Sequence, residues 1–173
     1  MEDVYRPAED SYLLARHVES LVSGAVLDMG TGSGIQAITA ALKPTVTSVL
    51  AVDINPEALN EAKKLAEDEG ISGKLTYVIS DLFHEVQGRF DWIIFNSPYL
   101  PSEGKADEYA WAGGAELIER FLIDACNHLE LMGSILLIYS SLSEPDLSRY
   151  NVELLEEIGI FFEKLYCVRL SPT

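Results

Sequence analysis

One glycine-rich segment directly follows an apolar run near the start of the chain. It reads Asp28-Met29-Gly30-Thr31-Gly32-Ser33-Gly34, and its three glycines let the backbone turn tightly and let a ligand approach main-chain N–H groups. The spacing is G-x-G-x-G, which differs from the G-x-G-x-x-G that cradles a pyrophosphate and therefore argues against a nicotinamide dinucleotide. The segment indicates a ligand-binding loop, although glycine-rich turns also occur as plain structural turns.

Two aspartates follow the next two apolar runs. Asp53 stands nineteen residues after Gly34, a separation at which an acidic side chain can accept hydrogen bonds from both ribose hydroxyls of a nucleoside. Asp53 could instead cap the following helix, but Asn55 already fills that role. Asp81 offers a carboxylate to an adenine edge and Leu82 an apolar contact to its ring. The pair predicts a nucleoside site.

A fourth apolar run, 92–95, ends in Asn96-Ser97-Pro98-Tyr99. The side-chain oxygen of Asn96 and the main-chain carbonyl of Ser97 can each accept one N–H of a planar –NH₂ group. Tyr99 can stack on that planar group and Pro98 stiffens the turn, so that the nitrogen is held in line with an electrophile. Such support suits an amide nitrogen, whose lone pair is delocalised and therefore weakly nucleophilic.

Alternating strands and helices position these four segments. We expect strands at 25–29, 48–52, 74–80, 91–95 and 134–139, and a final strand or hairpin pair over 161–170. We expect helices within 4–22 after an extended start, at 35–42, from the Asn55 cap to Gly70, and at 116–131 and 144–158. Strands that are apolar on both faces predict a mostly parallel sheet covered by helices on both sides. Ligands of such sheets bind beyond the carboxyl ends of the strands, where the four segments lie.

Composition restricts the class of protein. The 173 residues suit one domain, and 28 acidic against 12 basic residues give a formal charge of −16, which disfavours a polyphosphate partner. The apolar runs are shorter than the roughly 18 residues that span a bilayer, and the acidic start lacks the basic region of a signal peptide, so we expect a cytoplasmic protein. Two separated cysteines and three scattered histidines predict neither a disulfide framework nor a metal site.

The four segments together resemble the class I S-adenosylmethionine-dependent methyltransferases that modify planar amino groups, whose motif is (Asn/Asp)-Pro-Pro-(Tyr/Phe/Trp). Within that class the chain resembles the HemK-like glutamine methyltransferases of the short eukaryotic and archaeal branch. The segments that carry this resemblance are VYRPAEDSYLL at 4–14, NSPYLP at 96–101 and AWAGG at 110–114. It implies a Rossmann-like α/β fold with a mostly parallel seven-stranded sheet, a single domain over 1–173, and an N-terminal helical segment, 1–22, that packs over the cofactor site.

The resemblance also implies the site residues. The cofactor would be S-adenosyl-L-methionine, with S-adenosyl-L-homocysteine as product, Asp28 near the amino end of its methionine moiety and Ser11 near its carboxylate. The expected catalytic residues are Asn96, Ser97, Pro98 and Tyr99. The expected cofactor-binding residues are Ser11, Asp28, Gly30, Thr31, Gly32, Gly34, Asp53, Ile54, Asp81, Leu82 and Asn96. Ser97 departs from the family's first proline, which weakens preorganisation of the turn and puts the catalytic rate in question.

The acceptor implied by the resemblance is the glutamine of the Gly-Gly-Gln loop of a class I peptide-chain release factor. The same resemblance implies a small zinc-binding activator, for which the predicted edge strand 74–79 offers a docking site. The residues leave other acceptors open, namely an adenine or guanine amino group in RNA or DNA and a protein lysine. A subunit that binds S-adenosylmethionine without catalysis is a further alternative, motivated by Ser97.

Overall fold

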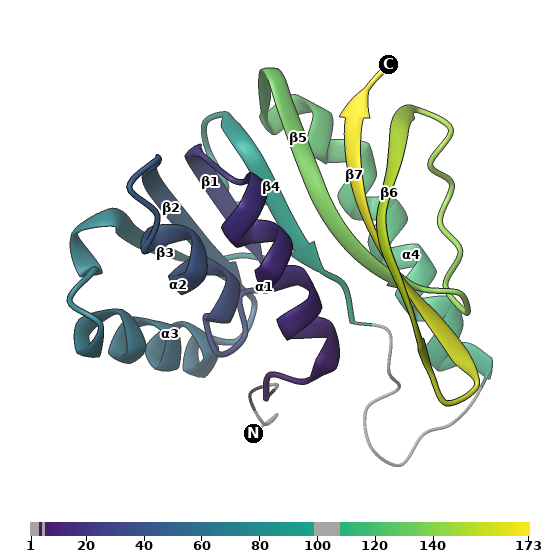
Figure 1. Cartoon of the computed structure of the whole chain (residues 1–173), viewed down its shortest axis with the longest axis horizontal. Helices are drawn as coiled ribbons and strands as arrows, with labels where there is room; N and C mark the ends of the chain where they lie inside the picture. Colours follow the sequence, from purple (N-terminus) through teal and green to yellow (C-terminus); the bar gives the residue numbers. More distant parts are fainter. Residues whose placement is uncertain (1–3, 5, 99–107) are drawn as a thin grey trace.

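The computed structural model describes residue 4, residues 6–98 and residues 108–173, with the side chains of the last range from residue 114 onward. One seven-stranded sheet forms its centre, in the order β3-β2-β1-β4-β5-β7-β6 (Figure 1). The strands are β1 (Gly24–Met29), β2 (Val46–Asp53), β3 (Leu75–Ile79), β4 (Phe90–Asn96), β5 (Leu129–Ser140), β6 (Tyr150–Ile160) and β7 (Glu163–Pro172). The first five are parallel, and β7 runs antiparallel to both β5 and β6. This sheet confirms the predicted Rossmann-like class I methyltransferase fold.

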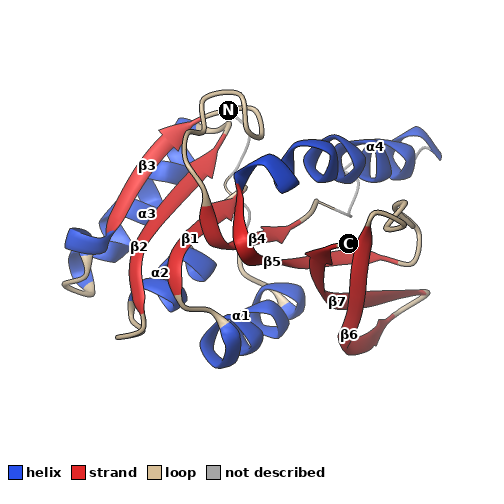
Figure 2. Cartoon of the chain, turned by 90° about the horizontal axis from the view of Figure 1, so that it is seen from above, coloured by secondary structure: helices blue, strands red, loops and turns tan. Residues whose placement is uncertain are grey.

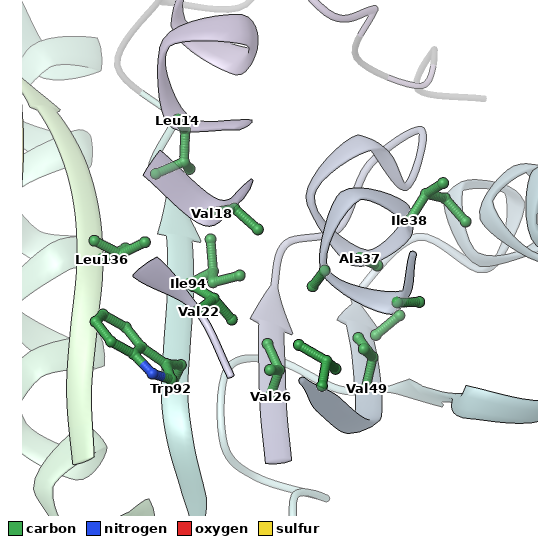
Figure 3. Packing of buried hydrophobic residues seen from close by; sticks show 14 of the residues in the cluster. Leu14, Val18, Val22, Val26, Ala37, Ile38, Val49, Trp92, Ile94 and Leu136 are labelled. Carbon is green, nitrogen blue, oxygen red and sulfur yellow. The ribbon is translucent and has the colours of Figure 1, made fainter. Parts of the chain in front are cut away.

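Helices cover both faces of the sheet. The helices are α1 (Glu9–Leu21), α2 (Ile35–Ala41), α3 (Pro56–Asp68) and α4 (Glu108–Ala125). The first three pack on one face and α4 packs on the other, as the opposite positions of α1 and α4 in Figure 2 show. Figure 3 shows the first face, where Leu14 and Val18 of α1 meet Ile94 of β4. The next residue, Ile93, faces the opposite cluster, so β4 is buried on both sides as its apolar sequence predicts.

The predicted helix at 144–158 is wrong, because most of this segment forms β6, the strand at one edge of the sheet. A register shift between Leu154 and Glu156 breaks the two-residue alternation of the strand. The inward-packing residues Leu155 and Ile158 consequently lie three positions apart, which is the spacing of a helix. Pairing with β7 along the whole of β6 overrides the helical preference of the glutamates and leucines in the segment.

The predicted helix at 116–131 has the wrong bounds. The helix α4 begins at Glu108 and ends at Ala125, and a short 3₁₀ turn, Cys126–His128, leads into β5 at Leu129. Leu131 and Met132, which continue the apolar pattern, belong to the strand and are 96% and 88% exposed. Because both residues are apolar and lie just beyond the turn, their pattern extends the apparent helix by one turn.

The described part of the chain contains no helix with the length and hydropathy needed to cross a membrane. Cys126 and Cys167 are both free thiols. Within the same described residues no cluster of histidine, cysteine, aspartate and glutamate has the arrangement of a metal site.

Candidate active site

A cavity of about 540 Å³ opens beyond the carboxyl ends of the parallel strands. Its walls come from the first turn of α1, the glycine loop after β1, the ends of β2, β3 and β4, and Leu117 of α4. The cavity lies beside β1 and β4, the neighbours at which the strand order reverses, and its volume is typical of small-molecule sites.

Most of the predicted site residues meet at this cavity. Those that line it are Ser11, Gly30, Thr31, Gly32, Asp53, Ile54, Asp81, Leu82, Asn96, Ser97 and Pro98. The other three behave differently: Asp28 and Gly34 do not line the cavity, and Tyr99 lies outside the described residues. The roles assigned to all of these residues remain predictions.

Gly34 shapes the cavity indirectly, through the packing of two helices. Its φ of +90° is in the left-handed region, and a Cβ added there would lie 2.7 Å from the Cβ of Ala62 in α3. Only glycine lets α2 start this close to α3 without displacing one of them. The last glycine of the loop therefore serves the approach of α2 to α3, while Gly30 and Gly32 form the cavity wall.

Asp28 lies beneath the loop and holds it in place. One carboxylate oxygen, Oδ2, accepts hydrogen bonds from the Thr31 hydroxyl at 2.6 Å and from the Ala37 main-chain N–H at 3.0 Å. Complete burial raises the pKa of Asp28 to about 7, although both hydrogen bonds oppose the rise. This carboxylate links the glycine loop to the first turn of α2 from inside the protein.

Asp53 stands at the cavity wall with both oxygens already oriented. Oδ2 accepts a hydrogen bond from the Gly32 main-chain N–H and Oδ1 accepts one from the Asn55 main-chain N–H, each at 2.9 Å. Asn55 caps α3 as predicted, because its side chain accepts from the Glu57 N–H at 3.0 Å and Pro56 is the first helical residue. The carboxylate expected to bind ribose is thus held rigidly between the ends of β1 and β2.

Asp81 and Leu82 form a tight turn after β3. The turn is closed by the Ser80 hydroxyl, which donates to the Leu82 carbonyl at 2.8 Å, and Leu82 adopts a positive φ of +48°. Oδ2 of Asp81 accepts a hydrogen bond from Arg120 of α4 at 2.8 Å. Arg120 was not predicted as a site residue, because nothing in its local sequence places it opposite the end of β3.

Asn96 lines the cavity, and its side-chain amide has a fixed orientation. Its Nδ2 donates to Oδ2 of Asp10 at 2.5 Å, so the nitrogen of the amide faces Asp10. The other atom, Oδ1, is buried and has no hydrogen-bond partner among the described residues. Asn96 therefore holds an unused acceptor at the position where the planar –NH₂ group is expected.

Ser97 is better anchored than its sequence suggested. Its hydroxyl donates to the Ile138 carbonyl of β5 at 2.7 Å, and the residue is only 1% exposed. This bond restricts the turn from the side, which offsets the loss of the ring that a proline would supply at this position. The main-chain carbonyl of Ser97 is therefore held by the sheet itself.

Two residues of the cavity lining were not among the predicted site residues, namely Asp10 at the start of α1 and Gln36 in the first turn of α2. Asp10 is buried, and the main-chain carbonyl of Ser11 accepts a hydrogen bond from Nε2 of Gln36 at 2.8 Å. The sequence held a signal for each: Asp10 stands beside Ser11 in the motif, and Gln36 is the polar residue between Ile35 and Ala37 directly after the glycine loop.

The AWAGG segment lies in the first turns of α4, where Gly114 is the residue whose surroundings are described. A Cβ added to Gly114 would lie 2.9 Å from the Ser143 hydroxyl and 3.2 Å from the Pro98 carbonyl. The helix therefore packs directly against the turn that holds Asn96 and Ser97.

Comparison with known proteins agrees with this geometry. The family model of the methyltransferase small domain matches residues 7–157. A protein of Methanocaldococcus jannaschii, provisionally described as a protein N5-glutamine methyltransferase, is 34% identical over 96% of this chain and 90% of its own length. The release factor glutamine methyltransferase of Chlorobaculum tepidum is 35% identical over 63% of this chain, which spans only 37% of that enzyme.

Solved structures share the fold. The protein TrmK of M. capricolum, in complex with the cofactor product S-adenosyl-homocysteine, superposes with a TM-score of 0.69 at 15% identity, over 91% of this chain and 67% of that one. Together with the sequence matches and the cavity at the strand ends, these findings identify S-adenosylmethionine as the cofactor. The chain therefore belongs to the methyltransferase small-domain family, as a HemK-like member of the class I S-adenosylmethionine-dependent methyltransferases.

Proposed function

We propose that the protein methylates the side-chain amide nitrogen of a glutamine, and that this glutamine belongs to the Gly-Gly-Gln loop of a class I peptide-chain release factor. The observation that carries the proposal is Oδ1 of the cavity residue Asn96, which is buried and has no hydrogen-bond partner in the described part of the chain. A planar –NH₂ group supplies the donor that this oxygen lacks, and the named activities of the two relatives support glutamine as its source. Such an acceptor would place the reaction in the cytoplasm.

The residues of the chain act on the acceptor nitrogen. Asn96 Oδ1 and the Ser97 carbonyl each accept one N–H, which turns the nitrogen lone pair toward the methyl group and favours its pyramidalisation. When bound, S-adenosylmethionine supplies an electrophilic methyl group on a sulfonium. The N–C bond forms as the S–C bond breaks, S-adenosylhomocysteine leaves, and the amide nitrogen releases one proton to solvent. Asp10 keeps the Asn96 amide in the orientation that this step requires.

The charge of the protein favours a protein acceptor over a nucleic acid. A formal charge of −16 repels phosphates over most of the surface, and a nucleobase would also have to be flipped into the cavity. A protein glutamine meets neither obstacle, because it carries no phosphate and is not part of a base stack.

The test is transfer of labelled methyl from S-adenosylmethionine to a purified class I release factor, with the modified residue mapped by tandem mass spectrometry. We expect label on the Gly-Gly-Gln glutamine, and none when that glutamine is substituted or when Asn96→Ala is used. Asn60→Ala is the matched control enzyme, because Asn60 is exposed on α3 and does not line the cavity, and it should keep full activity. Label on RNA or on a lysine, with none on the release factor, would assign a different acceptor and refute the proposal.

A zinc-binding activator would dock on β3 in this proposal. The strand lies at the edge of the sheet, and its last residue, Ile79, is 56% exposed. A free edge strand and an exposed apolar side chain together suit pairing with a strand of a partner. Hydrogen exchange of the complex should slow at residues 75–79 and remain unchanged in β6, the opposite edge. Protection of β6 alone would exclude this docking site.

A further inference from the structure

We infer that Gln36 is a cofactor-binding residue, and that its Oε1 accepts a hydrogen bond from the α-ammonium group of the methionine moiety of S-adenosylmethionine. Gln36 lies in the first turn of α2, lines the cavity and is 3% exposed. Its Oε1 is buried without a hydrogen-bond partner among the described residues. A buried carbonyl oxygen without a donor is unfavourable, so its retention at the wall of a ligand cavity indicates that the ligand brings the donor.

The orientation of this side chain is determined by α1. Nε2 of Gln36 donates to the main-chain carbonyl of Ser11 at 2.8 Å, and a carbonyl can only accept. The nitrogen end of the amide must therefore face α1, which leaves Oε1 at the other end of the amide. The Asn96 amide is oriented in the same way, because its nitrogen faces Asp10, the residue directly before Ser11 in α1. Two consecutive residues of α1 thus orient two amide groups, and the oxygen of each amide has no hydrogen-bond partner within the residues that the structure describes.

The chemistry of the ligand identifies the group that Gln36 binds. S-adenosylmethionine carries hydrogen-bond donors at the adenine amino group, at the two ribose hydroxyls and at the α-ammonium. The inference rests on the expected placement of adenine at Asp81 and of ribose at Asp53, which accounts for the first two kinds of donor at the ends of β3 and β2. Gln36 instead contacts α1 and follows the glycine loop. The donor that remains for it is the α-ammonium.

The electrostatics of this end of the cavity agree with a cation. Asp10, adjacent in sequence to the carbonyl that binds Gln36, is 1% exposed and lines the same cavity. A buried carboxyl group and an amide oxygen both favour a positive group and disfavour the α-carboxylate of the same ligand. The α-carboxylate would therefore point away from Gln36.

Binding experiments without any acceptor test this assignment. S-adenosylhomocysteine contains the amino-acid portion, whereas 5′-methylthioadenosine contains the adenosine and the sulfur but lacks the amino acid. For Gln36→Met we expect the Kd of S-adenosylhomocysteine to rise roughly tenfold or more, as for loss of a hydrogen bond to a charged group, and the Kd of methylthioadenosine to change less than about twofold. Isothermal titration calorimetry measures both constants.

A second variant keeps the acceptor atom. In Gln36→Glu, burial and the Ser11 carbonyl favour a protonated carboxyl, whose hydroxyl can donate to that carbonyl in place of Nε2 while its other oxygen stays an acceptor. It should therefore bind S-adenosylhomocysteine within about threefold of the wild type. It should also retain the preference for S-adenosylhomocysteine over its deaminated analogue, and this comparison suffices if Gln36→Met fails to fold. Equal weakening of both ligands in Gln36→Met, or loss of the preference in Gln36→Glu, would overturn the assignment. Methyl transfer to a release factor is not part of these measurements, so their failure is distinct from failure of the proposed function.

Discussion

Gly114 of α4 packs against the turn at residues 96–98, so one methyl group added at Gly114 should affect both stability and the position of that turn. In Gly114→Ala the new Cβ would lie 2.9 Å from the Ser143 hydroxyl and 3.2 Å from the Pro98 carbonyl, so at least one of them must move. Overpacking of a buried site costs about 1–3 kcal/mol. Replacing a helical glycine by alanine returns about 0.5–1 kcal/mol. We therefore expect a net destabilisation of about 1–2 kcal/mol, with the Pro98 carbonyl displaced by a few tenths of an ångström.

A second substitution should relieve the first. The Ser143 hydroxyl is buried and has no hydrogen-bond partner among the described residues, so Ser143→Ala alone should be neutral or slightly stabilising. In the double variant the contact nearest to the new Cβ would be the Pro98 carbonyl, because the Ser143 Cβ is at an ordinary 3.7 Å. The two substitutions should thus be coupled by about 1–2 kcal/mol in the free energy of unfolding.

Urea denaturation of the four proteins measures this coupling, and methyl transfer measures its effect on the site. Gly114→Ala should lower kcat about tenfold, because the turn that holds the acceptor is displaced, and should leave the Kd of S-adenosylhomocysteine within about twofold. Ser143→Ala should restore part of the rate. Additive changes in stability, or a loss of cofactor affinity equal to the loss of rate, would show that α4 does not act on the turn through this contact.

Three further predictions concern the glycine loop and the carboxylates around it. Gly34→Ala should destabilise the protein by about 2–4 kcal/mol in urea, because it combines a positive φ with a clash against Ala62, whereas Gly88→Ala, with a similar φ and open space, should cost only about 1 kcal/mol. The free energy of unfolding should fall as pH rises from about 4 to about 7, because folded Asp28 keeps a proton that the unfolded chain releases. Urea midpoints measured across this pH range should therefore fall less in Asp28→Asn than in the wild type. Asp53→Asn should raise the Kd of S-adenosylhomocysteine and of methylthioadenosine in parallel, by about tenfold in calorimetry, because both ligands contain the ribose.

Local signals in the sequence account for the elements that were predicted correctly. The start of α3 is one example, because its cap and first residue, Asn55 and Pro56, are adjacent in sequence and act through main-chain geometry alone. The strand β6 is the opposite case. Its state depends on hydrogen bonds to β7 and on a bulge, and its local composition favours a helix. Pairing with β7 therefore determines that this segment is a strand, which its local pattern of apolar residues did not predict.

The same distinction applies to the site. Asp53 and Asn96 could be placed at the cavity from sequence, because each directly follows a strand and the carboxyl ends of parallel strands meet. Asp28 and Gln36 could not be distinguished in this way. They lie at opposite ends of one glycine loop, and the direction of each side chain depends on the positive φ angles between them. Spacing alone thus located the loop but did not show which polar side chain faces the cavity.

The docking of α1 has a consequence for how the protein folds. Asp10 of α1 accepts a hydrogen bond from Asn96, 86 residues away along the chain, and Arg16 of α1 donates one to Glu156 in β6, 140 residues away. Contacts of such separation form late, because the intervening chain must be ordered before they contribute stability. During synthesis α1 leaves the ribosome before the strands of the sheet, yet it can reach its final position only when the sheet is nearly complete. The two oriented amides, and with them a cavity ready for both substrates, would then arise in the last step of folding.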